Sequence, residues 1–160
     1  MWLFLKNLLF TVLVPGTVAV YVPLSLVSGR PDAPGPLLVV AGVLLCIGAA
    51  IYGWCVWDFA SFGRGTPAPI DEPRKLVVRG LYRYTRNPMY VGVLAVILGW
   101  AVAFQSRVLL IYALIVFSFF HLFVLFYEEP HLEHVFGDEY RRYRARVHRW
   151  LPWARREPAA

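Results

Sequence analysis

The sequence predicts an all-α integral membrane protein with about four transmembrane helices and a C-terminal amphipathic helix at the membrane interface. Of its 160 residues, 59% are hydrophobic, whereas soluble domains contain about 45–50%. Four uncharged runs are each long enough to cross a bilayer as a helix, which takes roughly 20 residues. These runs are 8–27, 37–57, 88–106 and 108–127.

The first run is interpreted as a membrane span and not as a signal peptide. It is longer than the apolar region of a signal peptide, and no cleavage site of the Ala-x-Ala kind follows it. Pro15, Gly16 and Pro23 predict a kinked helix, which a membrane tolerates where neighbouring helices satisfy the freed carbonyls. The turn-rich segment SGRPDAPGP connects this span to the second run as a hairpin.

The second half of the chain begins with the longest connection outside the membrane, whose Gly and Pro content argues against a regular helix. Within it, KLVV is expected to be extended. Very few residues separate the third and fourth runs, which predicts a tight antiparallel hairpin. We expect one membrane domain, composed of an N-terminal hairpin over 1–60 and a core over 61–160.

The C-terminal segment is predicted to form a helix that lies on the membrane surface or folds back over the spans. Pro130 suits the first turn of a new helix. Apolar and aromatic residues then recur at helical spacing and give the helix one apolar face. These residues are Leu132, Phe136, Tyr140, Tyr143 and Val147.

The distribution of charge predicts the orientation in the membrane. The net charge is +6, and 13 of the 16 Lys and Arg residues lie either in 64–86 or in 141–156. With four spans both basic segments fall on the same side, and the positive-inside rule makes that side cytoplasmic, together with both termini. The basic segments adjoin membrane ends, so a nucleic-acid-binding function is disfavoured.

The segment RGLYRYTRNPMYVG, residues 79–92, lies at the mouth of the third span. Tyr and Arg are common interfacial anchors for reasons of solvation alone. The dense cluster, with Asn-Pro at the helix start, also suits an anion, because backbone N–H groups at a helix N-terminus attract negative charge. Both interpretations stand at this point.

Glu128 and Glu129 follow the fourth span, where a helix C-terminus disfavours acidic side chains. They either begin the next helix or bind a ligand's hydroxyl or ammonium groups. Glu128, His131 and His134 also raise a metal site, but the matching Glu-x-x-His motif of di-iron proteins is missing. His121, alone in the fourth span, is interpreted as a packing residue. We therefore assign no metal.

Residues from about 60 to 153 resemble the isoprenylcysteine carboxyl methyltransferase family and the related phospholipid methyltransferases of prokaryotes. The resemblance rests on GLYRYTRNPMYVG, a short hairpin, and EEPHLEHVFGDEYRRYRARVHRWLP. It implies an integral membrane methyltransferase that uses S-adenosylmethionine bound on the cytoplasmic side. The first two spans match this family only in kind.

The resemblance also implies which residues bind the cofactor. Carried onto this chain, these are Lys75, Leu76, Val77, Tyr82, Asn87, Pro88, Met89, Tyr90 and Glu128, with Glu129 beside it. Arg83, Arg86, Tyr143 and Tyr140 are further candidates for closing the site and assisting catalysis. Asn87 replaces a His found in many members, and Val124 replaces an Arg that serves the substrate carboxylate in eukaryotic enzymes.

These residues suit S-adenosylmethionine chemically. Arginines and a helix N-terminus match its carboxylate, tyrosine faces match its sulfonium, and a glutamate matches its diol or ammonium. The sequence predicts methyl transfer to an O, N or S atom of a small lipophilic or amphiphilic acceptor, at the bacterial inner membrane with the lipid bilayer as partner. The alternatives are a non-enzymatic membrane scaffold or assembly protein and a metal-dependent membrane oxidase.

Overall fold

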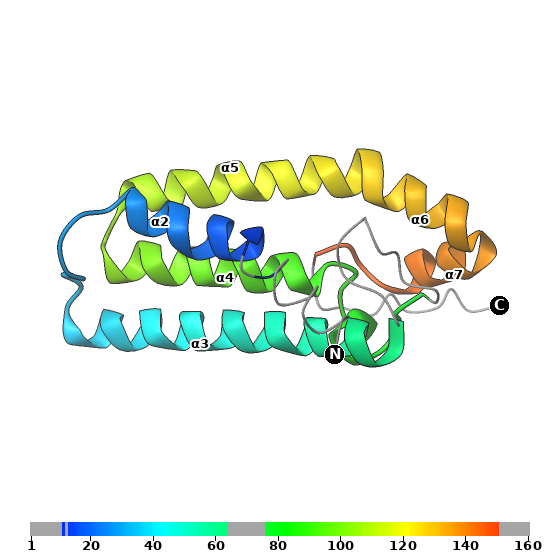
Figure 1. Ribbon diagram of the computed structural model, residues 1–160, viewed down its shortest axis with the longest axis horizontal. Helices are drawn as coiled ribbons and strands as arrows, with labels where there is room; N and C mark the ends of the chain where they lie inside the picture. The colour runs from blue at the N-terminus through cyan, green and yellow to red at the C-terminus, as the bar shows by residue number, and fades with distance from the viewer. Residues whose placement is uncertain (1–10, 12, 64–75, 151–160) are drawn as a thin grey trace.

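The computed structural model describes residues 11, 13–63 and 76–150, and this part of the chain contains helices and no β-strand. Figure 1 shows α3, α4 and α5 as long rods, with α2 near one end of the bundle and α6 and α7 at the other. The named helices are α2 (Val22–Ser25), α3 (Gly35–Asp58), α4 (Pro88–Ala103), α5 (Arg107–Phe123), α6 (Glu129–Phe136) and α7 (Asp138–Arg146). Shorter turns are Thr17–Tyr21, Phe59–Gly63 and Val124–Glu128, which are π-helical, and Gly80–Arg83, which is 3-10 helical.

The packing of α3 against α4 depends on glycines. A Cβ atom on Gly48 would lie 2.6 Å from the carbonyl oxygen of Gly92, and one on Gly92 would lie 2.9 Å from that of Gly48. Gly99 approaches Leu45 in the same way, about two turns further along α4. Small residues of this kind allow helix backbones to approach closely, which is a common basis of helix association in membranes.

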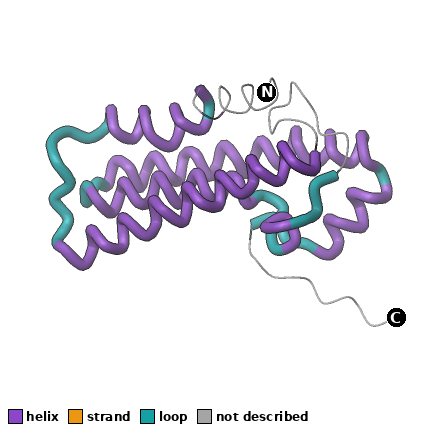
Figure 2. Tube along the Cα trace, turned by 60° about the horizontal axis from the view of Figure 1, so that its bottom comes forward, coloured by secondary structure: helices purple, strands orange, loops and turns teal. Residues whose placement is uncertain are grey.

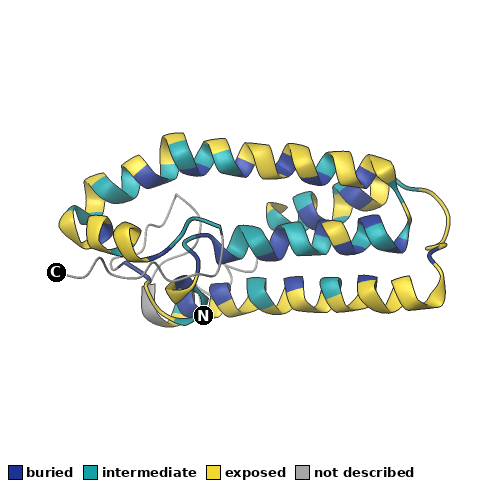
Figure 3. Ribbon diagram, turned by 180° about the vertical axis from the view of Figure 1, so that it is seen from behind, coloured by how far each residue is buried: buried dark blue, intermediate teal, exposed yellow. Residues whose placement is uncertain are grey.

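Two helices are long and apolar enough to cross a membrane by length and composition, Gly35–Ser61 and Arg107–Phe136. The third candidate, α4, has 16 residues, and the first run falls partly outside the described residues. Large apolar side chains such as Leu114, Phe119 and Phe126 point outward and are 64–73% exposed. Figure 3 shows exposed residues running along the outer faces of α3 and α5. This pattern suits contact with lipid, and the four-span arrangement remains a prediction.

The core lies between α4, α5 and the turn before α2. Its buried members are Ala19, Val93, Ile97, Ala113, Val116 and Phe120. The hydroxyl group of Tyr112 on α5 donates to the carbonyl of Val18 at 2.9 Å, which ties the first helical segment to the bundle. Pro23 is in the first turn of α2, directly after a π-helical turn. The kink that the prolines predict stays a prediction.

The C-terminal region differs from the single helix that the sequence predicts to begin near Pro130. The helix of α5 continues through the π-helical turn into α6, as far as Phe136. It ends there because Gly137 adopts a φ of +51°, a conformation that favours glycine, and α7 begins at the next residue. Figure 2 shows α6 and α7 as separate tubes at one end of the bundle. An interfacial location of these helices remains a prediction.

Candidate active site

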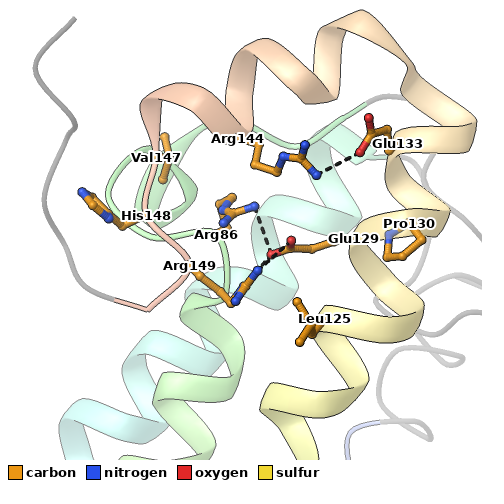
Figure 4. Close-up of a pocket in the computed structure, with 9 residues that line it drawn as sticks. All are labelled: Arg86, Leu125, Glu129, Pro130, Glu133, Arg144, Val147, His148 and Arg149. Carbon is orange, nitrogen blue, oxygen red and sulfur yellow. Dashed lines mark hydrogen bonds and ion pairs between the residues drawn. The ribbon is translucent and has the colours of Figure 1, made fainter. Parts of the chain in front are cut away.

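The polar end of the bundle brings together three segments that are distant in sequence. They are the loop 79–87 before α4, the junction between α5 and α6, and residues 147–150, which follow α7 and which we call the strap. Figure 4 shows side chains from all three around one pocket. Its volume is about 560 Å³, within the range of about 300–1,000 Å³ usual for ligand pockets. The lining residues are Arg86, Leu125, Glu129, Pro130, Glu133, Arg144, Val147, His148 and Arg149.

Glu129 is the central anion of this pocket. Its carboxylate accepts two hydrogen bonds from Arg149, Nε to Oε1 at 2.7 Å and Nη2 to Oε2 at 2.9 Å. Nη1 of Arg86 lies 3.0 Å from Oε1, with both side chains at most 10% exposed. Acceptance by Glu129 raises the pKa of the Arg149 guanidinium. Two positive groups face one carboxylate, so this cluster retains one net positive charge.

The strap is attached to the loop before α4 through its backbone. Thr85 and His148 form an isolated parallel β-bridge, and the amide of Arg86 donates to the His148 carbonyl at 2.9 Å. The Arg149 carbonyl accepts from the Thr85 hydroxyl and from Nδ2 of Asn87, each at 3.0 Å. These bonds satisfy the polar groups of buried Thr85 and Asn87, and they place Arg149 against Glu129.

Glu128 points to a different neighbour. Its Oε2 accepts from the Tyr90 hydroxyl on α4 at 3.0 Å. The Tyr90 ring lies 4.4 Å from Phe120 and 6.5 Å from Trp150, measured between centroids. Adjacent residues on a helix diverge by about 100°, so the two glutamates make separate contacts. Glu129 lines the pocket, whereas Glu128 contacts a group of rings between α4 and α5 that we call the aromatic region, formed by Tyr90, Phe120 and Trp150.

Several other predicted cofactor residues belong to a second buried cluster. Tyr82, Val77 and Cys55 are buried together, with Met89 packed against them. Burial raises the pKa of the Tyr82 hydroxyl, which keeps it protonated. Tyr143 on α7 donates to the Tyr82 carbonyl at 2.7 Å and so holds this loop in place.

The other predicted residues are distributed as follows. Leu76 and Pro88 are buried, whereas Arg83 is exposed to solvent and is not among the residues that line the pocket. Tyr140 is buried and its hydroxyl accepts from Nη1 of Arg86 at 3.4 Å. Lys75 lies outside the described residues. The structure therefore gathers most of the predicted set at one end of the bundle.

Two residues that sequence reasoning did not select have structural prominence here. Arg149 is the bidentate partner of Glu129, and no local motif distinguishes it from the six other basic residues of its segment. Asp58 is 1% exposed at the end of α3, where its Oδ1 pairs with Nε of Arg79 at 3.1 Å. Its Oδ2 has no hydrogen-bond partner among the described residues. A lone acid ending a long apolar run was the available signal for Asp58.

The metal alternative receives no geometric support in the part of the chain that the structure describes. No group of three or more His, Cys, Asp or Glu side chains is arranged there to hold an ion. Glu128 contacts Tyr90, and the His131 ring stacks on Tyr127 with centroids 6.0 Å apart. These two side chains are directed to aromatic neighbours.

Two apolar helices of membrane-spanning length carry large outward-facing side chains, and a charged pocket lies at one end of their bundle, which indicates a membrane-associated helical protein. The family model described as phospholipid methyltransferase matches residues 37–139. The chain therefore belongs to the phospholipid methyltransferase family, and the relatives that follow are methyltransferases.

Three curated relatives carry three different names. "Methanethiol S-methyltransferase 1" of Bradyrhizobium diazoefficiens is 36% identical over 47% of this chain and 25% of that protein. "Protein-S-isoprenylcysteine O-methyltransferase" of Rattus norvegicus is 32% identical over 72% of this chain and 42% of that protein. "Phosphatidylethanolamine N-methyltransferase" of Uncinocarpus reesii is 31% identical over 57% of this chain and 8% of that protein.

The chain thus aligns with less than half the length of each of these three relatives. No solved structure is significantly similar to it.

Proposed function

We propose that this chain is an integral membrane methyltransferase that transfers the methyl group of S-adenosylmethionine to a small lipophilic or amphiphilic acceptor. The observation that carries the proposal is the placement of two adjacent glutamates at the polar end of an apolar bundle. Glu129 belongs to a charged pocket and Glu128 to an aromatic region between helices. A polar cofactor and an apolar acceptor need such neighbouring environments.

The donor set suits S-adenosylmethionine. The Arg86–Glu129–Arg149 cluster has one surplus positive charge, and Nε of Arg86 is buried without a hydrogen-bond partner in the described part of the chain, so an anionic carboxylate is favoured there. The carboxylate of Glu128 and the ring of Tyr90 favour a cation. The cofactor has both an anionic and a cationic end, so these adjacent sites match its charges.

Each residue then has a defined role. Arg86 would hold the cofactor carboxylate, while Glu128 and Tyr90 would hold its cationic part. Asn87, Pro88 and Met89 would form the wall at the start of α4, and Leu76, Val77 and Tyr82 would support that wall from behind. Tyr143 would position Tyr82 through its carbonyl. Glu129 would fix the two arginines and act on the cofactor mainly through them.

When bound, S-adenosylmethionine would supply a methyl group on a positively charged sulfur, and that sulfur would leave as a neutral thioether as the acceptor lone pair forms the new bond to carbon. The chain supplies position and exclusion of water, which account for much of the rate in a displacement of this kind. A thiol or ammonium acceptor must also lose its proton. Glu128 is the anionic group at the aromatic side of the site and can accept that proton directly or through Tyr90.

The test is titration of the purified protein in lipid nanodiscs with S-adenosylmethionine by calorimetry, with ATP as a control for nucleotides in general. Methyl transfer is then measured with labelled cofactor and a panel of thiol, amine and carboxylate amphiphiles. Saturable binding and labelled product are expected. Absence of binding to the correctly folded protein would refute the proposal and favour the non-enzymatic alternative.

A further inference from the structure

We infer that Trp150 sets the length of the acceptor chain that this site admits, because its indole fills the space between α4 and α5 on the apolar side of Tyr90. The inference rests on the proposed methyltransferase function and adds to it a residue that determines specificity. It predicts that the unmodified protein prefers short-chain acceptors to long-chain ones.

The position of Trp150 is defined by rings from two helices. Its ring centroid lies 5.2 Å from Phe117 and 6.1 Å from His121 on α5, and 6.5 Å from Tyr90 on α4. The side chain is half-buried and packs against the core cluster shared by α4 and α5. A residue that follows the last described helix is thus inserted between two helices of the bundle.

A polar contact fixes the orientation of the indole. Nε1 of Trp150 donates to Nδ1 of His121 at 3.0 Å. An indole N–H can only donate, so His121 accepts from Trp150 at Nδ1. Both side chains are partly buried, which limits the competition of water for this bond and strengthens it.

This side chain adjoins the proposed reaction centre. Tyr90 contacts Glu128 through its hydroxyl and Trp150 through its ring. An acceptor whose nucleophilic atom lies near the hydroxyl of Tyr90 would extend its alkyl chain past the ring toward Phe117. Phe117 is 38% exposed on α5, so its ring borders the surface of the bundle, where lipid is expected. Trp150 therefore occupies the path between the reacting atom and the bilayer.

The strap fixes the backbone from which the indole projects. Arg149, the preceding residue, is bound to Glu129 through two hydrogen bonds and to Thr85 and Asn87 through its carbonyl. Displacing the backbone of Trp150 would disturb the same contacts that form the charged pocket. A long acceptor chain must therefore stop at the indole, break its hydrogen bond with His121 or break this network.

The experiment compares Trp150→Ala, Trp150→Phe and the control Trp57→Ala in nanodiscs. Trp57 is 68% exposed on α3 and belongs to neither site, so it matches the substitution without opening the acceptor path. The readout is the ratio of kcat/KM for dodecanethiol to that for butanethiol, with dodecylamine and butylamine as a second pair. Each acceptor partitions into the bilayer equally for all variants, so a difference in this ratio between variants reflects a difference in how the protein accepts the chain.

Trp150→Ala should raise the ratio by about tenfold or more, equivalent to about 1.4 kcal/mol, because removal of the indole relieves the steric exclusion of the long chain. Trp150→Phe retains most of the ring and should change it by less, and Trp57→Ala should leave it unchanged. An unchanged ratio in an active Trp150→Ala protein would overturn the inference while leaving the methyltransferase function intact.

A second measurement decides the inference even if no acceptor is methylated, an outcome that would count against the proposed function. A dodecanethiol carrying a photoreactive diazirine is cross-linked to each variant, and the labelled peptides are identified. Greater labelling around Phe117 in Trp150→Ala than in Trp57→Ala supports occupation of the opened space. Equal labelling contradicts it.

Discussion

Glu129→Gln and Glu128→Gln make the same small change at adjacent residues and are expected to have different effects. Glu129 pairs with two arginines, Arg149 and Arg86, whereas Glu128 accepts one hydrogen bond from a neutral tyrosine hydroxyl. The first substitution should therefore affect the free energy of unfolding, and the second should affect cofactor affinity.

The expected loss of unfolding free energy in Glu129→Gln follows from the burial of this ion pair. The side chains of Glu129 and Arg86 are 7% and 10% exposed, and that of Arg149 is 25% exposed. Removing one partner of a buried ion pair costs about 3–5 kcal/mol, because the remaining charge is left without compensation. Since Arg149 retains some contact with solvent, we expect a loss near the lower bound, about 3 kcal/mol.

The expected loss of cofactor affinity in Glu128→Gln follows from the proposed contact of Glu128 with the cofactor. A hydrogen bond to a charged group contributes about 1.5–3 kcal/mol. Loss of that contact corresponds to roughly a tenfold to hundredfold weaker Kd for S-adenosylmethionine. In the Glu128→Gln protein the side-chain amide oxygen can still accept from Tyr90, so folding should change little.

Glu133→Gln is the matched control, because it makes the same substitution one turn further along α6. Glu133 pairs with Arg144 at 2.9 Å, but these side chains are 31% and 43% exposed. Such exposed pairs contribute about 0–1 kcal/mol. Unfolding is followed by circular dichroism during denaturant titration in detergent, and binding by calorimetry. If Glu129→Gln and Glu133→Gln unfold at the same denaturant concentration, the central role of the buried cluster is refuted.

Three further predictions concern topology, packing and the acceptor. Cysteines introduced at Asp71 and Ala159 should react with an impermeant maleimide from the same side of the membrane, and labelling from opposite sides would overturn the four-span topology. Gly92→Leu should prevent the close approach of α3 and α4 and lower the yield of folded protein, with Gly53→Leu, which has open space around its Cβ, as the control. Because Val124 is buried and uncharged, a farnesylcysteine analogue should be methylated more slowly than thiol or amine amphiphiles, and faster turnover of that analogue would contradict the idea.

The sequence predicts α4 and α5 well because hydrophobic runs and a proline mark them locally. The third run is expected to begin at Pro88, and α4 begins there, since proline at the first helical position lacks only an N–H that the helix does not use. His121 is interpreted as a packing residue, and its hydrogen bond with Trp150 agrees with that interpretation.

The parts that the sequence does not predict depend on contacts between distant residues. The chemistry of two adjacent glutamates does not by itself separate the roles of Glu128 and Glu129, which depend on the distant positions of Tyr90 and Arg149. The break at Gly137 interrupts a periodic apolar pattern that by itself predicts a continuous helix, because periodicity reports burial and not the backbone conformation of one glycine. The strap has no regular pattern at all.

The strap connects the two halves of the site within a few residues, which makes a further prediction possible. His148 binds the loop before α4, Arg149 binds Glu129, and Trp150 binds His121. Residues that share a network show interaction energies of about 0.5–3 kcal/mol in double-mutant cycles, whereas distant sites add within about 0.5 kcal/mol.

The cycle combines Glu129→Gln with Trp150→Phe and measures the free energy of unfolding of all four proteins. Either change alone releases one end of Arg149–Trp150, so the second change should cost less than it does in the unmodified protein. The cycle of Glu129→Gln with Trp57→Phe should be additive, because Trp57 is exposed on α3. Additivity in both cycles would show that the strap does not couple the charged pocket energetically to the aromatic region. Trp150 would then be held by the bundle alone.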